Sequence, residues 1–169
     1  MLIRQETPND YGEVYKLIKK AFLTAEYTDG NEHNLIVALR KGSAFIPELS
    51  LIAEINNELV GHIMFTKAMV EKDEILALAP LSVKPRYQRQ GVGTALIMEG
   101  HKIAKQMGYQ YSLVLGSKTY YQRAGYQPAK RFGIEVPKNF LSENFLAIKL
   151  QENAKPLCGT VIYSKEFGL

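Results

Sequence analysis

The chain has 169 residues, of which 46% are hydrophobic and 22% charged, and its net charge is +4. These values are typical of a soluble globular protein and exclude a disordered or collagen-like chain. The positive charges are scattered, which fits a small anionic ligand as well as nucleic acid. With a single cysteine, no signal peptide and no apolar run long enough for a membrane span, the sequence predicts a cytoplasmic protein without membrane contact.

The N-terminal part of the chain predicts one strand and two helices. Residues 2–5 have the pattern of a short strand, and Thr7 and Pro8 suit the start of a helix that ends near Phe22. A second and shorter apolar stripe at helical spacing follows and stops at Gly42.

Three strand-like runs follow in the middle of the chain. Residues 51–55 and 59–70 flank Asn56-Asn57, and asparagine tolerates the positive φ angles of a tight hairpin turn. The third run, residues 75–83, contains Pro80, which has no N–H for a neighbouring strand and therefore marks an edge or a bulge. An antiparallel hairpin followed by an irregular strand is the prediction.

The second half of the chain predicts one long helix and several short elements. No repeat, linker or low-complexity segment interrupts it, so we expect a single α/β domain over residues 1–169. The expected ranges are a helix at 91–107 ended by Gly108, a strand at 111–115, a short helix at 119–124 ended by Gly125, and strands at 145–150 and 160–163.

The stretch between the third strand and the long helix is the most informative. Gly91 and Gly93 stand at the expected helix start, where unpaired N–H groups and the helix dipole can accept a phosphate. The spacing matches neither the dinucleotide-binding nor the Walker glycine pattern. Paired glycines can simply turn a chain into a helix, but the cations of Lys84, Arg86 and Arg89 favour an anionic ligand.

The proline in the preceding strand adds to this interpretation. A strand that splays at Pro80 leaves backbone groups of Leu81 and Val83 without a neighbouring strand. Such groups pair with water or with a ligand. An extended ligand that carries amides would fill the gap.

Two runs carry a family resemblance. Gln88-Arg89-Gln90-Gly91-Val92-Gly93 has the pattern Gln/Arg-x-x-Gly-x-Gly/Ala, and residues 120–126, Tyr-Tyr-Gln-Arg-Ala-Gly-Tyr, have the pattern aromatic-Tyr-x-x-x-Gly-aromatic. The sequence thus resembles the GCN5-related N-acetyltransferase (GNAT) family over about the first 130 residues, and residues 159–163 are similar to its YhbS-like subgroup. That subgroup often carries Gly-Asp-Pro where this chain has Gly116-Ser117-Lys118.

The resemblance implies both a fold and an activity. The fold would be an α/β (α+β) GNAT fold, a mixed and mostly antiparallel sheet with a bulged central strand at Pro80–Val83, flanked by about four helices. The activity would be transfer of an acetyl group from acetyl-CoA, the co-substrate, to a primary amine of a small molecule or protein, by direct attack and without a metal. The alternative is a non-catalytic acyl-CoA-binding sensor built on the same fold.

The resemblance also implies roles for individual residues. Tyr121 would protonate the departing thiolate, and the backbone N–H of Leu81 would stabilise the oxyanion. In the family the glycine loop binds the CoA pyrophosphate and the bulged strand binds the pantetheine amides. The residues that would contact CoA are Leu81, Ser82, Val83, Gln88, Arg89, Gln90, Gly91, Val92, Gly93, Thr94 and Tyr121.

No residue stands out as the general base. Glu54 and Glu74 lie in or near predicted strands, where they fit either a solvated position or one that points into the cleft, and Glu32 fits a favourable partner for a helix dipole. His62 alternates with apolar residues in a strand, a pattern typical of a hydrogen-bonded structural histidine. We expect His101 at the surface of the long helix.

The remaining predictions concern metals and partners. Three histidines and one cysteine without ligand spacing predict no metal site, and Cys158 is expected to be a small buried residue. No recognition motif accompanies Lys130-Arg131, so nucleic acid is not expected as a partner. The acceptor is an unidentified amine, its cleft would lie between the first two helices and the C-terminal strands, and the protein would be a monomer or homodimer.

Overall fold

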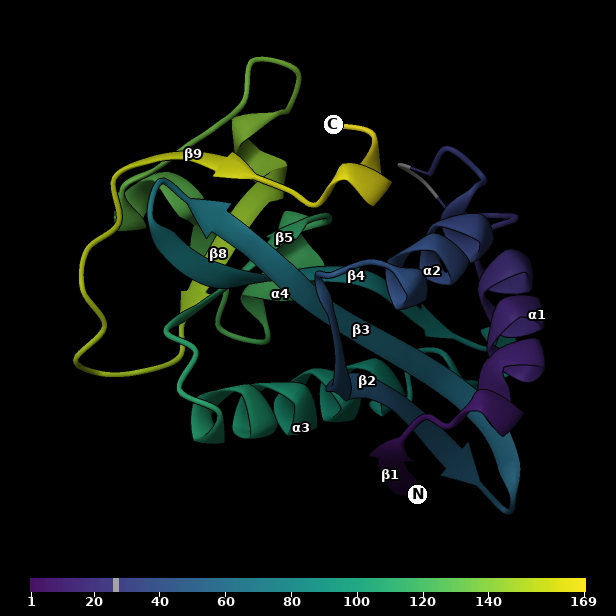
Figure 1. Ribbon diagram of the computed structural model, residues 1–169. Helices are drawn as coiled ribbons and strands as arrows, with labels where there is room; N and C mark the ends of the chain where they lie inside the picture. The colour runs from purple at the N-terminus through teal and green to yellow at the C-terminus, as the bar shows by residue number, and fades with distance from the viewer. Residues whose placement is uncertain (26–27) are drawn as a thin grey trace.

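The computed structural model describes residues 1–25 and 28–169, and its centre is a mixed β-sheet (Figure 1). The strands in the main path lie in the order β1-β2-β3-β4-β5-β8-β6, and β9 joins at one end of β3. The strands are β1 (Leu2–Gln5), β2 (Phe45–Ile55), β3 (Glu58–Val70), β4 (Asp73–Val83), β5 (Tyr111–Leu115), β6 (Gln127–Pro128), β7 (Ile134–Glu135), β8 (Phe145–Lys149) and β9 (Gly159–Ile162).

Helices cover both faces of this sheet. Ile63 and Phe65 of β3 pack with Leu96 on one face, whereas Met64, between them in sequence, packs with Val14 and Ile36 on the other. This alternation follows from the two-residue period of a strand. The helices are α1 (Tyr11–Ala21) and α2 (Glu32–Lys41) on the Met64 face, α3 (Val92–Gln106) on the Phe65 face, and the short α4 (Lys118–Gln122) near β8.

Local sequence signals explain several of the boundaries. Asn56 and Asn57 have φ angles of 51° and 64° and close the hairpin of β2 and β3, as predicted. Pro8 begins a 3₁₀ turn with Thr7 before it, and α1 continues from Tyr11 with Phe22 as its C-terminal cap. β2 begins six residues earlier than predicted, because the run from Phe45 onward still pairs with β3 through a bulge.

The irregular strand lies inside the sheet rather than at its edge. β4 runs between β3 and β5, and the register with β3 passes from Phe65↔Leu78 to Ile63↔Leu81. Ala79 and Pro80 thus form the bulge that the proline predicted. The mixed, mostly antiparallel sheet with a bulged interior strand and four α-helices in the described residues confirms the predicted fold.

Two expectations about burial are wrong. His101 is buried because it follows Ile97 by one helical turn on the side of α3 that faces the sheet, where it lies beside Phe65. The spacing of Ile97, His101 and Ala104 carried this signal. Cys158 is exposed, because it lies in the loop before β9 rather than in a strand.

No helix within residues 1–25 and 28–169 combines the length and the apolar character needed to cross a membrane.

Candidate functional site

The bulge in β4 opens a gap between two strands of the sheet. β4 and β5 run parallel and pair at Leu76↔Ser112 and Ala77↔Leu113. Within the described part of the chain, no pair joins these two strands beyond Ala77. The second half of β4 therefore has β3 on one side only.

The backbone direction in this half of β4 follows from one hydrogen bond. The N–H of Lys84 donates to the carbonyl of Val60 in β3 at 2.8 Å. Since N–H groups alternate between the two sides of a strand, the N–H groups of Val83 and Leu81 point away from β3 and into the gap. The N–H groups of Leu81 and Val83 thus have no partner in β3 and face the gap between β4 and β5.

The basic loop after β4 is held by an acidic residue that sequence reasoning missed. Glu58, in the β2–β3 hairpin, accepts hydrogen bonds from Lys84 Nζ and the Tyr87 hydroxyl, both at 2.9 Å, and pairs with Arg86. The hydrogen bond from Lys84, together with those from Tyr87 and Arg86, lowers the pKa of Glu58 to about 2. Two of the three expected anion-binding cations therefore already have a carboxylate partner.

The two glutamines of the loop brace its backbone. Gln88 Nε2 donates to the carbonyl of Val83 at 3.1 Å, and Gln90 Nε2 donates to the carbonyl of Arg86 at 2.8 Å. Arg89 lies between them with a positive φ of 61°, and it has no ion pair among the residues that the structure describes. Arg89 is thus the cation of this loop that can form an ion pair with a bound anion.

The first turn of α3 presents backbone N–H groups that have no hydrogen-bond partner within the helix. Gly91 caps the helix with φ +86°, a conformation that favours glycine, and no side chain beyond its chain neighbours lies within 4 Å of the place where its Cβ would be. The first helical bond runs from Ala95 N–H to the carbonyl of Gly91, so the N–H groups of Val92, Gly93 and Thr94 have no partner within the helix. Such an end attracts anions.

Gly93 is required for a different reason. A Cβ atom at Gly93 would lie 2.2 Å from the hydroxyl oxygen of Tyr120. Tyr120 belongs to α4, whose N-cap Ser117 accepts a hydrogen bond from the N–H of Tyr120 at 3.3 Å. The two recognised runs of sequence therefore meet in space, at the start of α3.

The three tyrosines of the second run have different surroundings. Tyr121 packs edge-on between Tyr120 at 5.0 Å and Tyr126 at 5.6 Å between ring centroids. Burial raises the pKa of Tyr121 further above neutral, so its phenol carries its proton at neutral pH. Tyr126 is a core residue, whose hydroxyl meets Ser112 at 2.8 Å and His101 Nε2 at 2.9 Å.

A buried polar cluster lies on the opposite face of the sheet, beneath α1 and α2. Arg40 donates two hydrogen bonds to Glu6, at 2.7 and 3.0 Å, and Glu6 also accepts from Ser50. His62 Nε2 lies 3.2 Å from Ser50 Oγ and 3.4 Å from Glu6 Oε2. Burial lowers the pKa of His62, which is therefore neutral near pH 7.

The pKa of Glu6 is shifted in the direction opposite to that of a catalytic acid, which needs a raised pKa. Burial alone would raise the pKa of Glu6, but the hydrogen bonds from His62, Arg40 and Ser50 outweigh burial and lower it to about 2. Glu6 thus remains an anion that anchors the first strand to α2 and the sheet. Glu54 and Glu74, neither of which the sequence marks as a general base, lie elsewhere: Glu54 pairs with Arg4, and Glu74 accepts from the Tyr109 hydroxyl.

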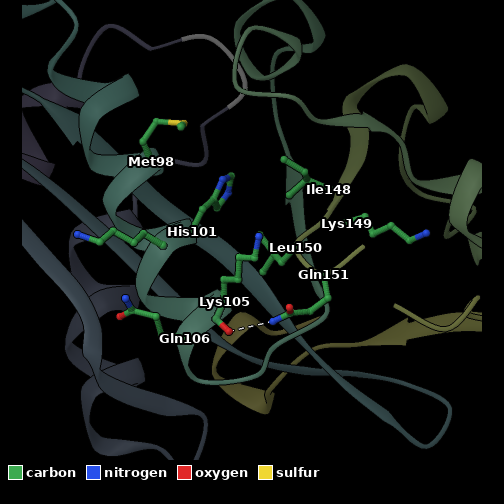
Figure 2. Close-up of a pocket in the computed structure, with 9 residues that line it drawn as sticks. Met98, His101, Lys105, Gln106, Ile148, Lys149, Leu150 and Gln151 are labelled. Carbon is green, nitrogen blue, oxygen red and sulfur yellow. Dashed lines mark hydrogen bonds between the residues drawn. The ribbon is translucent and has the colours of Figure 1, made fainter. Parts of the chain in front are cut away.

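A groove of about 600 Å³ lies apart from the start of α3 (Figure 2). Met98 and His101 of α3 form one wall, Ile148 of β8 and Leu150 beyond it form the other, and Gln151 Nε2 donates to the carbonyl of Lys105 at 2.9 Å. None of the predicted site residues lines this groove. Within the described ranges, no group of three or more His, Cys, Asp and Glu side chains is arranged to hold a metal ion.

Comparison with known proteins bears on this geometry. A family model described as "Acetyltransferase (GNAT) family" matches residues 12–126. The uncharacterised N-acetyltransferase YjhQ of Escherichia coli is 41% identical over 109 residues, which cover 62% of this chain and 60% of YjhQ. The alignment thus spans less than two thirds of YjhQ. The uncharacterised N-acetyltransferase YhbS of Escherichia coli is 26% identical over 171 residues, which cover 99% of this chain and 98% of YhbS.

Two crystal structures resemble the fold over nearly the whole chain. YhbS from Escherichia coli in complex with CoA has a TM-score of 0.89 at 24% identity, covering 99% of this chain and 92% of that one. A GNAT family acetyltransferase from Brucella melitensis in complex with acetyl-CoA has a TM-score of 0.81 at 28% identity, covering 98% of this chain and 97% of that one.

Proposed function

The chain belongs to the acetyltransferase (GNAT) family, and from this premise we propose that it transfers an acetyl group from acetyl-CoA to a primary amine of a small molecule or protein. The amine attacks the thioester directly while both substrates are bound. YhbS and the Brucella melitensis protein were solved with CoA and acetyl-CoA, which supports the choice of co-substrate. We further propose that residues 1–169 act as a single domain, as a monomer or homodimer.

The proposal rests on two sets of backbone donors that follow each other along the chain. The N–H groups of Leu81 and Val83 point into the gap between β4 and β5, and the loop after β4 then leads to the N–H groups at the start of α3, which have no partner within the helix. An extended ligand with amides at one end and a pyrophosphate at the other matches both donor sets. CoA has this chemistry, because its pantetheine arm carries amides and its pyrophosphate suits a helix N-terminus.

The proposed roles follow from these positions. The N–H of Leu81 stabilises the oxyanion of the tetrahedral intermediate, and the phenol of Tyr121 protonates the departing thiolate. Arg89 adds positive charge beside the pyrophosphate. The residues proposed to contact the co-substrate are Leu81, Ser82, Val83, Gln88, Arg89, Gln90, Gly91, Val92, Gly93, Thr94 and Tyr121.

Calorimetry and a thiol-release screen test the proposal. Acetyl-CoA should bind with a micromolar Kd, and release of CoA thiol should be measured against polyamines, amino acids, aminoglycosides and peptides. One productive acceptor would support the transferase. Tight binding without thiol release for any acceptor would support the acyl-CoA sensor instead, and absence of binding would refute both.

A further inference from the structure

The position of the Tyr121 hydroxyl is set by packing. Within the described part of the chain this hydroxyl makes no hydrogen bond, and burial is the largest cause of its raised pKa. The edges and faces of the Tyr120 and Tyr126 rings meet the Tyr121 ring from two directions. Since no hydrogen bond holds the oxygen, the residues in contact with the ring determine where it points.

Gly116, the first residue after β5, makes a third contact with this ring. A Cβ atom at Gly116 would lie 2.6 Å from Cε2 of Tyr121 and 3.6 Å from Cζ, the carbon that carries the hydroxyl. Gly116 does not have the positive φ angle that favours glycine. The backbone conformation therefore does not require glycine at position 116, whereas the closeness of the Tyr121 ring does.

Asn144 holds Gly116 in place by two hydrogen bonds. The last pair of the β5–β8 ladder is Leu115↔Phe145. One residue beyond it, the N–H of Gly116 donates to the carbonyl of Asn144 at 2.9 Å, and Nδ2 of Asn144 donates to the carbonyl of Gly116 at 3.0 Å. Both backbone polar groups of Gly116 are thus bonded to the same residue.

The side chain of Asn144 takes the place of a backbone donor. In a hydrogen-bonded antiparallel pair, the two residues exchange both N–H···O bonds. The N–H of Asn144 cannot serve Gly116, because it donates to the carbonyl of Leu141 at 3.0 Å at the 3₁₀ turn Ser142–Asn144. The side-chain amide supplies the missing donor, which a carboxylate of the same shape could not do.

We infer that Gly116 and Asn144 are positioning residues for the proton transfer from Tyr121. The inference rests on the proposed function. Gly116 is the surface against which the Tyr121 ring lies, and Asn144 fixes Gly116. In the step that they serve, the O–H bond of Tyr121 breaks, an S–H bond forms on the departing thiolate, and solvent returns a proton to the phenolate. Neither Gly116 nor Asn144 takes part in this exchange.

Two substitutions of Asn144 test the inference. Asn144→Ala removes the amide donor, and Asn144→Asp keeps the shape of the side chain but cannot donate to Gly116. Both should lower turnover at least about tenfold, because a small misplacement of a reacting group can cost about a hundredfold. Affinity for acetyl-CoA, measured by calorimetry, should stay within about twofold, since the loss concerns the transition state.

A double-mutant cycle with Tyr121→Phe distinguishes positioning from a general structural role. Without the phenolic oxygen there is no proton donor to aim, so Asn144→Ala should change the residual turnover of Tyr121→Phe by less than about twofold. A residue that merely supports the fold or the acetyl-CoA site would lower turnover by the same factor in both backgrounds. Equal factors would therefore overturn the inference.

Gln151→Ala is the matched control. Gln151 also donates a side-chain amide hydrogen bond to a backbone carbonyl, that of Lys105 at 2.9 Å, but it lies in the groove beside the C-terminal half of α3. Gln151→Ala should lower the thermal midpoint about as much as Asn144→Ala does, since each loses one such bond. Its turnover should equal that of the wild type.

Gly116→Ala tests the contact itself and does not depend on how the Asn144 variants fold. The added methyl group should push the Tyr121 ring aside, because overpacking forces neighbouring groups to move. Turnover should fall at least about tenfold in the wild-type background and by less than about twofold in the Tyr121→Phe background. Wild-type turnover of a folded Gly116→Ala protein would overturn the inference.

The outcomes separate the inference from the proposed function. If the wild type does not bind acetyl-CoA, or binds it and transfers acetyl to no acceptor, the proposed transferase and the inference both fail. If the wild type transfers acetyl and Tyr121→Phe is as fast, the inference fails and the transferase remains. If Tyr121→Phe is slow while Asn144→Ala and Gly116→Ala are as fast as the wild type, the inference alone is wrong.

Discussion

The hydroxyl of Tyr120 occupies the space that a side chain at Gly93 would need, since a Cβ atom there would lie 2.2 Å from it. The start of α3 and the tyrosine pair of α4 are thus in direct contact. The family pattern accepts alanine in place of Gly93, but in this chain the contact with Tyr120 makes glycine necessary. The glycine serves packing within the protein as well as room for a phosphate.

This contact predicts a rescue. Gly93→Ala should push the Tyr120 ring away from its place and weaken acetyl-CoA binding by roughly tenfold, because overpacking forces neighbouring groups to move. Adding Tyr120→Phe removes the clashing oxygen and should restore most of the affinity. Calorimetry on both single variants and the double variant measures the coupling. Strictly additive losses would show that the two residues act independently.

Local chemistry explains which parts of the fold the sequence predicts. The Asn56-Asn57 turn, the bulge at Pro80 and the start of α3 at Gly91 each depend on the backbone preferences of one or two residues. The pairing of Glu58 with Lys84 depends on a fold that brings together residues 26 positions apart. No periodicity or propensity marks such a pair. The same holds for Glu6 and Ser50, which are 44 positions apart.

At Gly91 a negative charge can be introduced without a change in the backbone conformation. Its φ of +86° is a conformation that asparagine and aspartate tolerate better than other residues, and the space beside it is empty. Gly91→Asn and Gly91→Asp should therefore fold alike. Aspartate at the donor end of α3 should repel a pyrophosphate and bind acetyl-CoA at least about tenfold more weakly than asparagine does. Equal affinities of the two variants would show that the pyrophosphate does not bind at this loop.

The buried Glu6 predicts how stability depends on pH. Its pKa of about 2 in the folded protein lies below the unfolded value of about 4.3, so its stabilisation is complete above the unfolded value and is lost as pH falls toward 2. A shift of this size corresponds to about 3 kcal/mol.

The variant Glu6→Gln isolates this contribution. It should unfold more easily than the wild type at neutral pH, and the difference in unfolding free energy should shrink as pH falls from about 5 to about 2. Urea denaturation across this range measures it. Glu58→Gln is the control, since Glu58 titrates in the same range but its ion pairs lie near the surface and are screened. A difference that stays constant with pH would contradict the assignment.

Cys158 should not take part in the reaction. It is exposed, it lies in the loop before β9, and direct attack by the amine requires no acetylated thiol. Cys158→Ser should retain acetyl transfer and nearly unchanged stability. Mass spectrometry after brief incubation with acetyl-CoA gives the complementary evidence. Accumulation of acetylated Cys158, or loss of transfer in a folded serine variant, would require a ping-pong route.

Tyr121→Phe tests the proton donor. The change keeps the ring between Tyr120 and Tyr126 and removes only the phenolic proton, so affinity for acetyl-CoA should be largely retained. Turnover should fall by roughly a hundred- to ten-thousandfold, the usual worth of general acid catalysis. Tyr120→Phe is the matched control, because it removes a hydroxyl from the neighbouring ring.

The pH profile distinguishes a donor from a packing residue. Because burial raises the pKa of Tyr121 above its ordinary value of about 10, the phenol keeps its proton through the alkaline range, and wild-type turnover should not fall there from loss of the acid. Tyr121→Phe should be slow at every pH in this range. If it instead keeps wild-type turnover, Tyr121 only packs and solvent protonates the thiolate. If Tyr120→Phe alone is slow, the hydroxyl beside Gly93 is the donor, and the role belongs to the first tyrosine of the pair.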